Sequence, residues 1–300
     1  MTVVGRWAPS PTGDFHIGNL RTALLAWLFA RSDGGRFLWR FEDLDITSKA
    51  EFRLTQQRDM NLIGLDWDGE PISQSDRLEL YAARLSELID AGYTYDCYCS
   101  RREIREAAAA PHDHLPEGAY SGTCRHLTAA QIAERQKSGR PPALRLAAHA
   151  VEETVFDRQL GEFTGVVDDV VLRRGDGTPA YNFVVVVDDD DQGINQVVRA
   201  DDLLASTPRQ VHLAHLLKAT VPEYAHVPMV LDGEQRRLAK RWGAVTLSDR
   251  IALGEKPITV LNALLSSLDL PQLGRVSELA TVLGVFDAVA LPRTPFIYEP

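Results

Sequence analysis

The apolar positions of the first sixty residues follow the period of a strand, then that of a helix, then that of a strand again. Residues 3–8 indicate a short strand that enters a Pro/Gly-rich turn, and residues 18–31 then place Leu20, Leu24 and Leu28 at helical spacing. Residues 37–42 alternate like a second strand. A strand, a helix and a strand form a βαβ unit, so we expect parallel strands with a ligand site at their carboxyl ends.

The rest of the chain continues this alternation and predicts an α/β fold. An unbroken apolar run at residues 181–187, followed by four aspartates, predicts a strand buried on both faces of a parallel sheet. Residues 107–118 predict a surface loop. The other expected elements are strands at 140–146 and 166–173, helices at 51–63, 77–91 (ended by Gly92) and 208–219, and helical segments at 258–268 and 276–286.

Composition and charge exclude several classes of protein. Hydrophobic residues make up 45% of the 300 and charged residues 25%, which is ordinary for a globular protein. The N-terminus lacks a secretory signal and no apolar run approaches the roughly 20 residues of a membrane span, so we expect a cytoplasmic monomer without a membrane partner. The net charge of −10 argues against a general nucleic-acid coat but leaves room for one tRNA bound through a local basic face.

Three cysteines fall within one short stretch and favour a metal site. Cys97, Cys99 and Cys124 are odd in number in a chain without an export signal, which disfavours a disulfide framework. Thiolates are soft ligands that favour zinc, and a structural zinc site needs four ligands. The candidates for the fourth ligand are Tyr120, His112, His114 and His126.

The turn between the first strand and the first helix carries the strongest functional signal. It contains two prolines that stiffen it, and Gly13 and Gly18 allow the backbone to approach a ligand. The helix that follows presents free N–H groups at its amino terminus, which suit a phosphate. His16 stands where an imidazole can donate to a phosphate oxygen as charge develops.

The whole string at residues 8–19, APSPTGDFHIGN, resembles the HIGH signature of class I aminoacyl-tRNA synthetases in its glutamyl form. The resemblance implies that ATP contacts His16, Gly18 and Asn19, and that His16 is catalytic. Phe15 and Asn19 depart from the common pattern, with asparagine at the second histidine position. Asparagine can still donate hydrogen bonds but carries no charge.

A second segment, RFEDLD at residues 40–45, resembles the corresponding segment of the glutamyl enzymes. A glutamate side chain needs a planar, bidentate cation, which arginine supplies, and its ammonium needs an acceptor such as Glu42. By this resemblance the residues expected to bind glutamate are Arg6, Trp7, Ala8, Pro9, Ser10, Glu42, Tyr181 and Arg199.

Residues 237–241, RLAKR, occupy the place of the KMSKS loop of the same family. The resemblance gives Lys240 a catalytic and ATP-binding role, in which it neutralises the departing pyrophosphate of ATP, a substrate that brings Mg²⁺. Arg237 replaces a lysine of the pattern and Ala239 replaces a serine. How strongly this loop binds the phosphates therefore stays an open question.

The resemblance extends from Arg6 to about Arg241, and only 59 residues, 242–300, follow. That is too few for the helical domain with which glutamyl-tRNA synthetases read an anticodon. The chain therefore resembles the glutamyl-queuosine tRNA(Asp) synthetases, a truncated branch with a Cys-x-Cys…Tyr-x-x-x-Cys zinc cluster that favours Tyr120 as fourth ligand. This branch activates glutamate without tRNA and transfers it to the queuosine base in the tRNA(Asp) anticodon.

The resemblance also predicts how the chain is organised. We expect residues 1–95 and 176–244 to form the two halves of a Rossmann-type catalytic domain, with a zinc-binding insertion at 96–175 and a short helical region, without an anticodon-binding domain, at 245–300. Two alternatives stay open. One is a short glutamyl-tRNA synthetase that charges tRNA(Glu) at its 3′ end. The other is a non-catalytic binding protein of the same fold, which the departures Asn19, Arg237 and Ala239 motivate.

Overall fold

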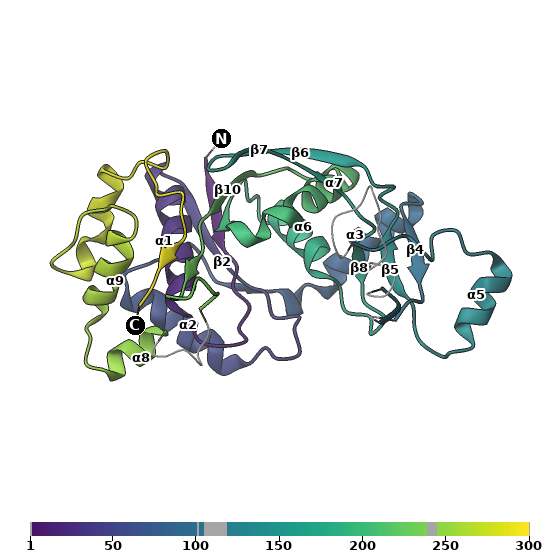
Figure 1. Cartoon of the computed structure of the whole chain (residues 1–300), viewed down its shortest axis with the longest axis horizontal. Coiled ribbons are helices and arrows are strands. Elements are labelled where there is room, and N and C mark those ends of the chain that lie inside the picture. Colours follow the sequence, from purple (N-terminus) through teal and green to yellow (C-terminus); the bar gives the residue numbers. More distant parts are fainter. Residues whose placement is uncertain (1, 101, 105–118, 239–244, 300) are drawn as a thin grey trace.

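A computed structural model describes residues 2–100, 102–104, 119–238 and 245–299. The molecule is elongated, with helix α9 (Pro257–Ser266) near one end and helix α5 (Ala129–Gln136) projecting at the other (Figure 1). Residues 107–118, the predicted surface loop, lie outside the described residues.

The predicted βαβ unit is confirmed. Strand β1 (Val4–Trp7), helix α1 (Ile17–Ser32) and strand β2 (Arg36–Phe41) follow one another, and β1 pairs with β2 in parallel. Strand β3 (Ile72–Ser73) extends this sheet beyond β2, also in parallel.

Two predicted helices follow this unit in the chain. Helices α2 (Ala50–Leu62) and α3 (Leu78–Asp90) are confirmed, the latter preceded by the short 3₁₀-helix η1 (Gln74–Asp76). Gly92 follows α3 with a φ of +75°, as expected of a left-handed cap.

A second sheet adjoins the first along β1. Its strands are β7 (Gly161–Val166), β6 (Glu152–Asp157), β10 (Glu223–Val227) and β9 (Gln196–Ala200), in that spatial order, with β9 and β10 parallel. Just before β9, the Asn195 N–H donates to the Val4 carbonyl (3.1 Å), and the Val4 N–H donates to Asn195 Oδ1 (2.8 Å). The order of the strands reverses at this junction. Parallel sheets place ligand sites at such reversals.

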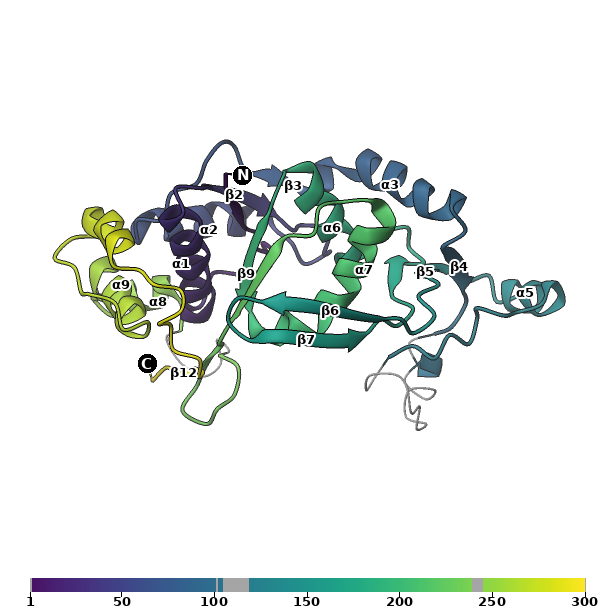
Figure 2. The same ribbon diagram turned by 90° about the horizontal axis from the view of Figure 1, so that it is seen from above.

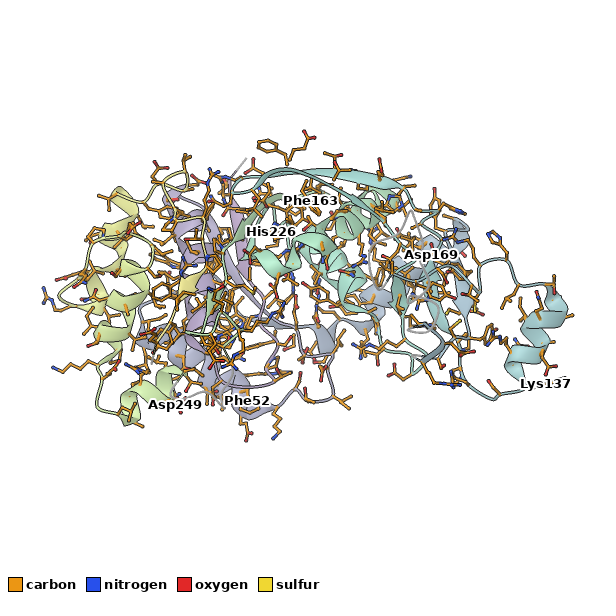
Figure 3. All side chains as sticks on the ribbon, viewed as in Figure 1. Phe52, Lys137, Phe163, Asp169, His226 and Asp249 are labelled. Carbon is orange, nitrogen blue, oxygen red and sulfur yellow. The ribbon has the colours of Figure 1, made fainter. Side chains whose placement is uncertain are left out.

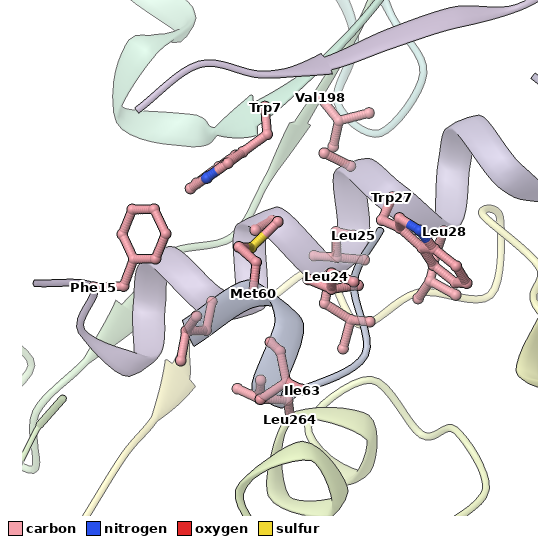
Figure 4. Close-up of a cluster of buried hydrophobic side chains, with 14 of the residues drawn as sticks. Trp7, Phe15, Leu24, Leu25, Trp27, Leu28, Met60, Ile63, Val198 and Leu264 are labelled. Atoms are coloured by element: carbon pink, nitrogen blue, oxygen red, sulfur yellow. The ribbon is translucent and has the colours of Figure 1, made fainter. Parts of the chain in front are cut away.

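The main core surrounds α1 and joins both ends of the chain. Figure 4 shows Trp7 of β1, Met60 of α2 and Leu264 of α9 packed with the buried leucines of α1. The predicted helix at 258–268 is confirmed as α9, and the segment at 276–286 contains the 3₁₀-helix η4 (Val276–Gly284). These two elements bury apolar side chains in the same core.

The C-terminal part of the chain contains one more helix and a short strand. Helix α8 (Leu247–Ala252) precedes α9, and strand β12 (Phe296–Ile297) pairs in parallel with β11 (Val230–Leu231).

A second group of elements holds the cysteine region. Strands β4 (Thr94–Cys97), β5 (Ala143–Leu146) and β8 (Val171–Arg173) form an antiparallel sheet, seen beside α5 in Figure 2. β5 confirms the strand expected at 140–146, whereas the strand expected at 166–173 divides into the end of β7 and β8. Helix α7 (Thr207–Leu217), after the 3₁₀-helix η2 (Asp201–Ser206), confirms the helix expected at 208–219. The division of the chain into four parts stays a prediction.

The strand predicted at residues 181–187 is wrong. These residues form helix α6 (Tyr181–Asp191), which buries its valines and continues through all four aspartates. A short apolar run carries no period that separates a buried strand from a buried helix. The tertiary structure favours the helix, because each of the four aspartates pairs with an arginine of a neighbouring element. These pairs join Asp188 and Asp191 to Arg77, Asp189 to Arg40, and Asp190 to Arg84.

Among the described residues, the longest helices fall short of the length and apolarity that a bilayer crossing requires.

We expect Leu24→Ala to lower the free energy of unfolding by about 2–5 kcal/mol, because Leu24 is fully buried in α1 and the change leaves a cavity. Denaturant unfolding followed by circular dichroism measures this loss. The matched control is Leu54→Ala on α2, where the leucine is 71% exposed, and we expect it to stay within about 0.5 kcal/mol of wild type. Equal losses in both variants would contradict this account of the core.

Candidate active site and metal centre

A cavity of about 540 Å³ opens at the carboxyl ends of β1 and β9. Four of the residues that line it come from separate elements: Arg6 from β1, Glu42 from just after β2, Tyr181 from the start of α6 and Arg199 from β9. The other lining residues that were expected from the sequence are Trp7, Ala8, Pro9, Ser10, His16, Gly18 and Asn19. The structure therefore brings every described residue predicted for glutamate or ATP to one cavity, while their roles as ligand contacts stay predictions.

His16 caps the helix that the signature turn precedes. Its Nδ1 accepts the Asn19 N–H (3.2 Å), and the Asn19 side chain accepts the His16 N–H (3.1 Å). Because Nδ1 is an acceptor, a neutral His16 carries its proton on Nε2. Gly18 leaves room for the imidazole, since a Cβ at this position would lie 3.0 Å from it. Asn19, the departure from the signature, thus has a structural role as the second half of the capping box.

Helix α2 holds the signature turn through a side chain that sequence analysis missed. Gln56 is almost fully buried and lines the cavity, and its Nε2 donates to the carbonyls of Ser10 (3.1 Å) and Gly13 (2.8 Å). Beside it, Thr55 donates to the Asp14 carboxylate (2.7 Å). The two hydrogen bonds of Gln56 tie the backbone of the turn to α2.

One wall of the cavity rests on a buried cluster of charges. Arg40, fully buried on β2, contacts Asp189 (2.7 Å), Glu42 (3.3 Å) and Asp188 (3.5 Å), and these carboxylates outweigh the effect of burial and raise its pKa. Arg6 lies 3.5 Å from the same Asp189. Burial raises the pKa of Glu42, and Arg40 and Arg6 offset part of that shift. The cluster holds Arg6 and Glu42 in place at the cavity.

Arg199 is held differently, by neutral groups. Its guanidinium donates to His226 Nε2 (3.0 Å), Gln210 Oε1 (2.8 Å) and Thr207 Oγ1 (2.8 Å). The other ring nitrogen of His226 lies 2.6 Å from the Asp157 carboxylate. His226, labelled in Figure 3, is fully buried.

Lys240, the predicted catalytic lysine, lies outside the described residues. The described residues that precede it reach the cavity. Arg237 and Leu238 line it, and Arg237 pairs with Asp202 (2.9 Å). On the other side, the carbonyl of Val245 accepts the Ile17 N–H (2.8 Å) at the start of α1.

The three cysteines and Tyr120 converge at the end of β4. The Sγ atoms of Cys97, Cys99 and Cys124 lie within 4.8 Å of one another. The Tyr120 hydroxyl is 3.3 Å from Cys97 Sγ and 3.4 Å from Cys99 Sγ, and the guanidinium of Arg145 lies over its ring. Of the other candidates, His126 is not part of this group, and His112 and His114 lie outside the described residues.

This donor set fits a divalent cation. Tetrahedral zinc with Zn–S bonds of about 2.3 Å separates its ligand atoms by about 3.8 Å, close to the distances found here. The Cys97 thiol donates to Cys124, which lowers the pKa of Cys124 to about 6 and raises that of Cys97 to about 12. A bound cation would stabilise the thiolate form of all three cysteines. The cysteine cluster can therefore bind a metal.

Comparison with known proteins identifies the family. Residues 2–268 match the family described as "tRNA synthetases class I (E and Q), catalytic domain". The chain belongs to this family. The predicted ligase-type enzyme class is therefore confirmed.

Several curated relatives of this class I synthetase share most of its length. The glutamyl-Q tRNA(Asp) synthetase of Nocardia farcinica is 56% identical over 98% of this chain and 92% of its own. The protein of that name from Cutibacterium acnes is 47% identical over 97% of this chain and 82% of its own. Glutamate–tRNA ligase 1 of Acidithiobacillus ferrooxidans is 40% identical over 88% of this chain, but the match covers 56% of that ligase.

A solved structure shows the same fold. The crystal structure of a glutamate tRNA ligase from Elizabethkingia meningosepticum in complex with its amino acid superposes with a TM-score of 0.82, at 23% identity, over 100% of this chain and 67% of that one. The class I synthetase fold predicted for this chain is confirmed.

Several residues that shape the site carried no usable signal in the sequence. His226 and Asp157 are separated by 69 positions and meet because β6 and β10 are neighbours. Gln56 is one of several polar residues on an amphipathic helix, and only its burial distinguishes it. Arg40 alternates with aromatic residues on β2, which indicated its face but not its three carboxylate partners.

We expect Gln56→Leu to lower the free energy of unfolding by about 1–3 kcal/mol, because it removes the donor to two carbonyls of the signature turn without opening a large cavity. Thermal and urea unfolding measure the loss. Gln57→Leu, one residue further along the same helix, is the control and should change stability by less than about 0.5 kcal/mol. The account of the turn is wrong if Gln56→Leu is as stable as the control.

Proposed function

We propose that this enzyme activates glutamate with ATP, without needing tRNA, and transfers it to the queuosine base in the anticodon of tRNA(Asp). The observation that carries the proposal is the single cavity lined by Arg6, Glu42, Tyr181 and Arg199, beside the histidine-capped start of α1.

The charges of the cavity suit a dicarboxylic amino acid. Guanidinium groups such as Arg6 and Arg199 can pair with the side-chain carboxylate of glutamate, and the carboxylate of Glu42 can accept its ammonium. Tyr181, 39% exposed and part of the cavity wall, adds a hydroxyl near these groups. A neutral amino acid would leave buried charges of this cavity unpaired, which is the basis of selectivity.

In the first step the α-carboxylate of glutamate attacks the α-phosphorus of ATP. The P–O bond to the β-phosphate breaks, pyrophosphate leaves, and glutamyl adenylate remains. His16 Nε2–H and the N–H groups at the start of α1 suit the phosphates, and Lys240, with the Mg²⁺ that accompanies ATP, balances the charge of the leaving pyrophosphate. Positioning and electrostatics carry this step, so no general base is assigned.

In the second step a hydroxyl of the queuosine cyclopentene ring attacks the carbonyl carbon of the mixed anhydride. An ester to the tRNA base forms, and AMP leaves with the electron pair of the broken C–O bond. Two comparisons support this acceptor over the 3′ end of tRNA(Glu). The identity to the Nocardia farcinica protein is 56% over 92% of its length, against 40% over 56% of the length of the ligase from Acidithiobacillus ferrooxidans.

We further propose that Cys97, Cys99, Cys124 and Tyr120 hold a structural Zn²⁺. Four protein ligands leave no open position for water, so the metal would link the end of β4 to the segment around Tyr120 and would take no part in catalysis. The reaction partner tRNA supports a cytoplasmic location.

We expect glutamate-dependent exchange of pyrophosphate into ATP in the absence of tRNA, and transfer of radioactive glutamate to tRNA(Asp) that carries queuosine. tRNA(Asp) without the modification is the matched control and should accept none. The label should stay on the tRNA after the terminal adenosine is removed.

Two outcomes would contradict the proposal. Transfer to tRNA(Glu) alone, lost with its 3′ adenosine, would identify a short glutamyl-tRNA synthetase. Absence of glutamate-dependent exchange would identify a non-catalytic protein of this fold.

We expect about one zinc ion per chain by plasma emission spectrometry, and tighter zinc binding than in Tyr120→Phe, because the phenylalanine variant keeps the ring and loses the oxygen ligand. Melting temperature should fall when a chelator removes the metal. His126→Ala is the control and should bind zinc like wild type. Unchanged zinc affinity in Tyr120→Phe together with a loss in His126→Ala would assign the fourth ligand to the histidine.

A further inference from the structure

A chain of buried polar groups runs behind the cavity, from β6 through β10 to β9. Asp157 Oδ2 lies 2.6 Å from His226 Nδ1, and His226 Nε2 lies 3.0 Å from Arg199 Nε. The three side chains are 1%, 0% and 5% exposed, in the order Asp157, His226, Arg199. Of the three, Arg199 lines the cavity.

The hydrogen bonds determine the tautomer of His226. Arg199 Nε can only donate, so His226 Nε2 must accept, and a neutral imidazole then carries its proton on Nδ1 and donates it to Asp157. Burial lowers the pKa of His226, and Arg199 lowers it further, although Asp157 opposes the shift. Asp157 is itself anchored, because it also accepts the N–H groups of Gln159 (2.9 Å) and Leu160 (3.0 Å).

The remaining contacts of Arg199 come from neutral side chains as well. Gln210 Oε1 and Thr207 Oγ1 accept from its two terminal nitrogens, and its guanidinium lies over the Tyr224 ring. A guanidinium has five N–H donors, and these three hydrogen bonds use three of them. Within the described part of the chain, Arg199 forms no ion pair, in contrast to Arg6 and Arg40.

We propose that Asp157 and His226 are positioning residues for the amino-acid subsite, which hold the guanidinium of Arg199 in one orientation through a neutral acceptor. A carboxylate in place of His226 would hold the arginine equally firmly but would compete with the substrate for its charge. The histidine fixes the arginine and leaves its charge, and two of its N–H groups, for a carboxylate of the ligand. This inference rests on the proposed function, in which Arg199 contacts glutamate.

Two substitutions at one position separate positioning from simple packing. In His226→Gln the side-chain oxygen can reach the place of Nε2 and accept from Arg199. In His226→Asn the shorter amide can replace Nδ1 and donate to Asp157, but nothing reaches Arg199. We expect His226→Asn to raise the KM for glutamate roughly tenfold or more in ATP–pyrophosphate exchange, with the KM for ATP unchanged, and His226→Gln to stay near wild type.

The matched control is His212→Asn. His212 pairs with Glu153 (2.8 Å), a carboxylate of the same strand β6, but neither residue lines the cavity. We expect this control to keep both KM values. A glutamate KM that is unchanged in His226→Asn, or raised equally in both His226 variants, overturns the inference while wild-type exchange still supports the proposed function. Absence of exchange in wild type overturns both.

If His226→Asn does not fold, Thr207→Val tests the same positioning with little change of volume. It removes the hydroxyl that accepts from Arg199 Nη2 (2.8 Å) and lies 3.1 Å from His226 Nε2. A raised glutamate KM supports the inference and an unchanged one overturns it.

The pH profile adds a readout that a purely structural role would not move. The charged groups that face His226 are Asp157 from β6, Arg199 from β9 and Asp201 from η2. Because the pKa of His226 is lowered from 6.5, it stays neutral until the pH falls below that value, and protonation then removes the acceptor and repels Arg199. We expect the wild-type KM for glutamate to rise below about pH 6.5 and the His226→Gln profile to stay flat. Parallel profiles overturn the inference.

Discussion

The junction between β1 and β9 is the constraint on which the rest of the structure depends. Hydrogen bonds between Val4 and Asn195 join two strands that are almost 200 residues apart in the chain. Because both strands end at the same edge, Arg6 and Arg199 face one cavity, and the turn after β1 brings His16 to it. Helix α1 then packs against both strands, so the core that stabilises the fold also sets the geometry of the site.

Two arginines at or behind the cavity wall are buried in different ways. Arg40 pairs with three carboxylates, and this cluster holds Glu42 and Arg6 in place. Arg199 is surrounded by neutral acceptors, the nearest carboxylate of its network lying beyond His226. In the first arrangement, carboxylates compensate the positive charge of Arg40 while they stabilise the wall of the cavity. In the second, the positive charge of Arg199 stays oriented for a ligand.

The cysteine cluster and the C-terminal part lie in different parts of the structure. Tyr120 and the three cysteines form a small apolar cluster with Tyr95, Ile104 and Leu127, separate from the main core. The C-terminal elements instead complete the core around α1, and β12 pairs with β11 beside the cavity. The cysteine cluster therefore belongs to the region around β4, whereas α9 belongs to the core that surrounds α1.

The sequence by itself determined the first βαβ unit, the signature turn and the cysteine cluster, because each lies within one continuous stretch of the chain. Its resemblance to the glutamyl enzymes also indicated Arg6, Glu42, Tyr181 and Arg199 as partners. Only the tertiary structure decided that residues 181–187 are helical, since Arg40, Arg77 and Arg84 compensate the aspartates that follow. It alone joined Asp157 and His226 to Arg199 and placed Gln56 under the turn. Such contacts depend on which strands lie side by side, and a local pattern of residues contains no information on that.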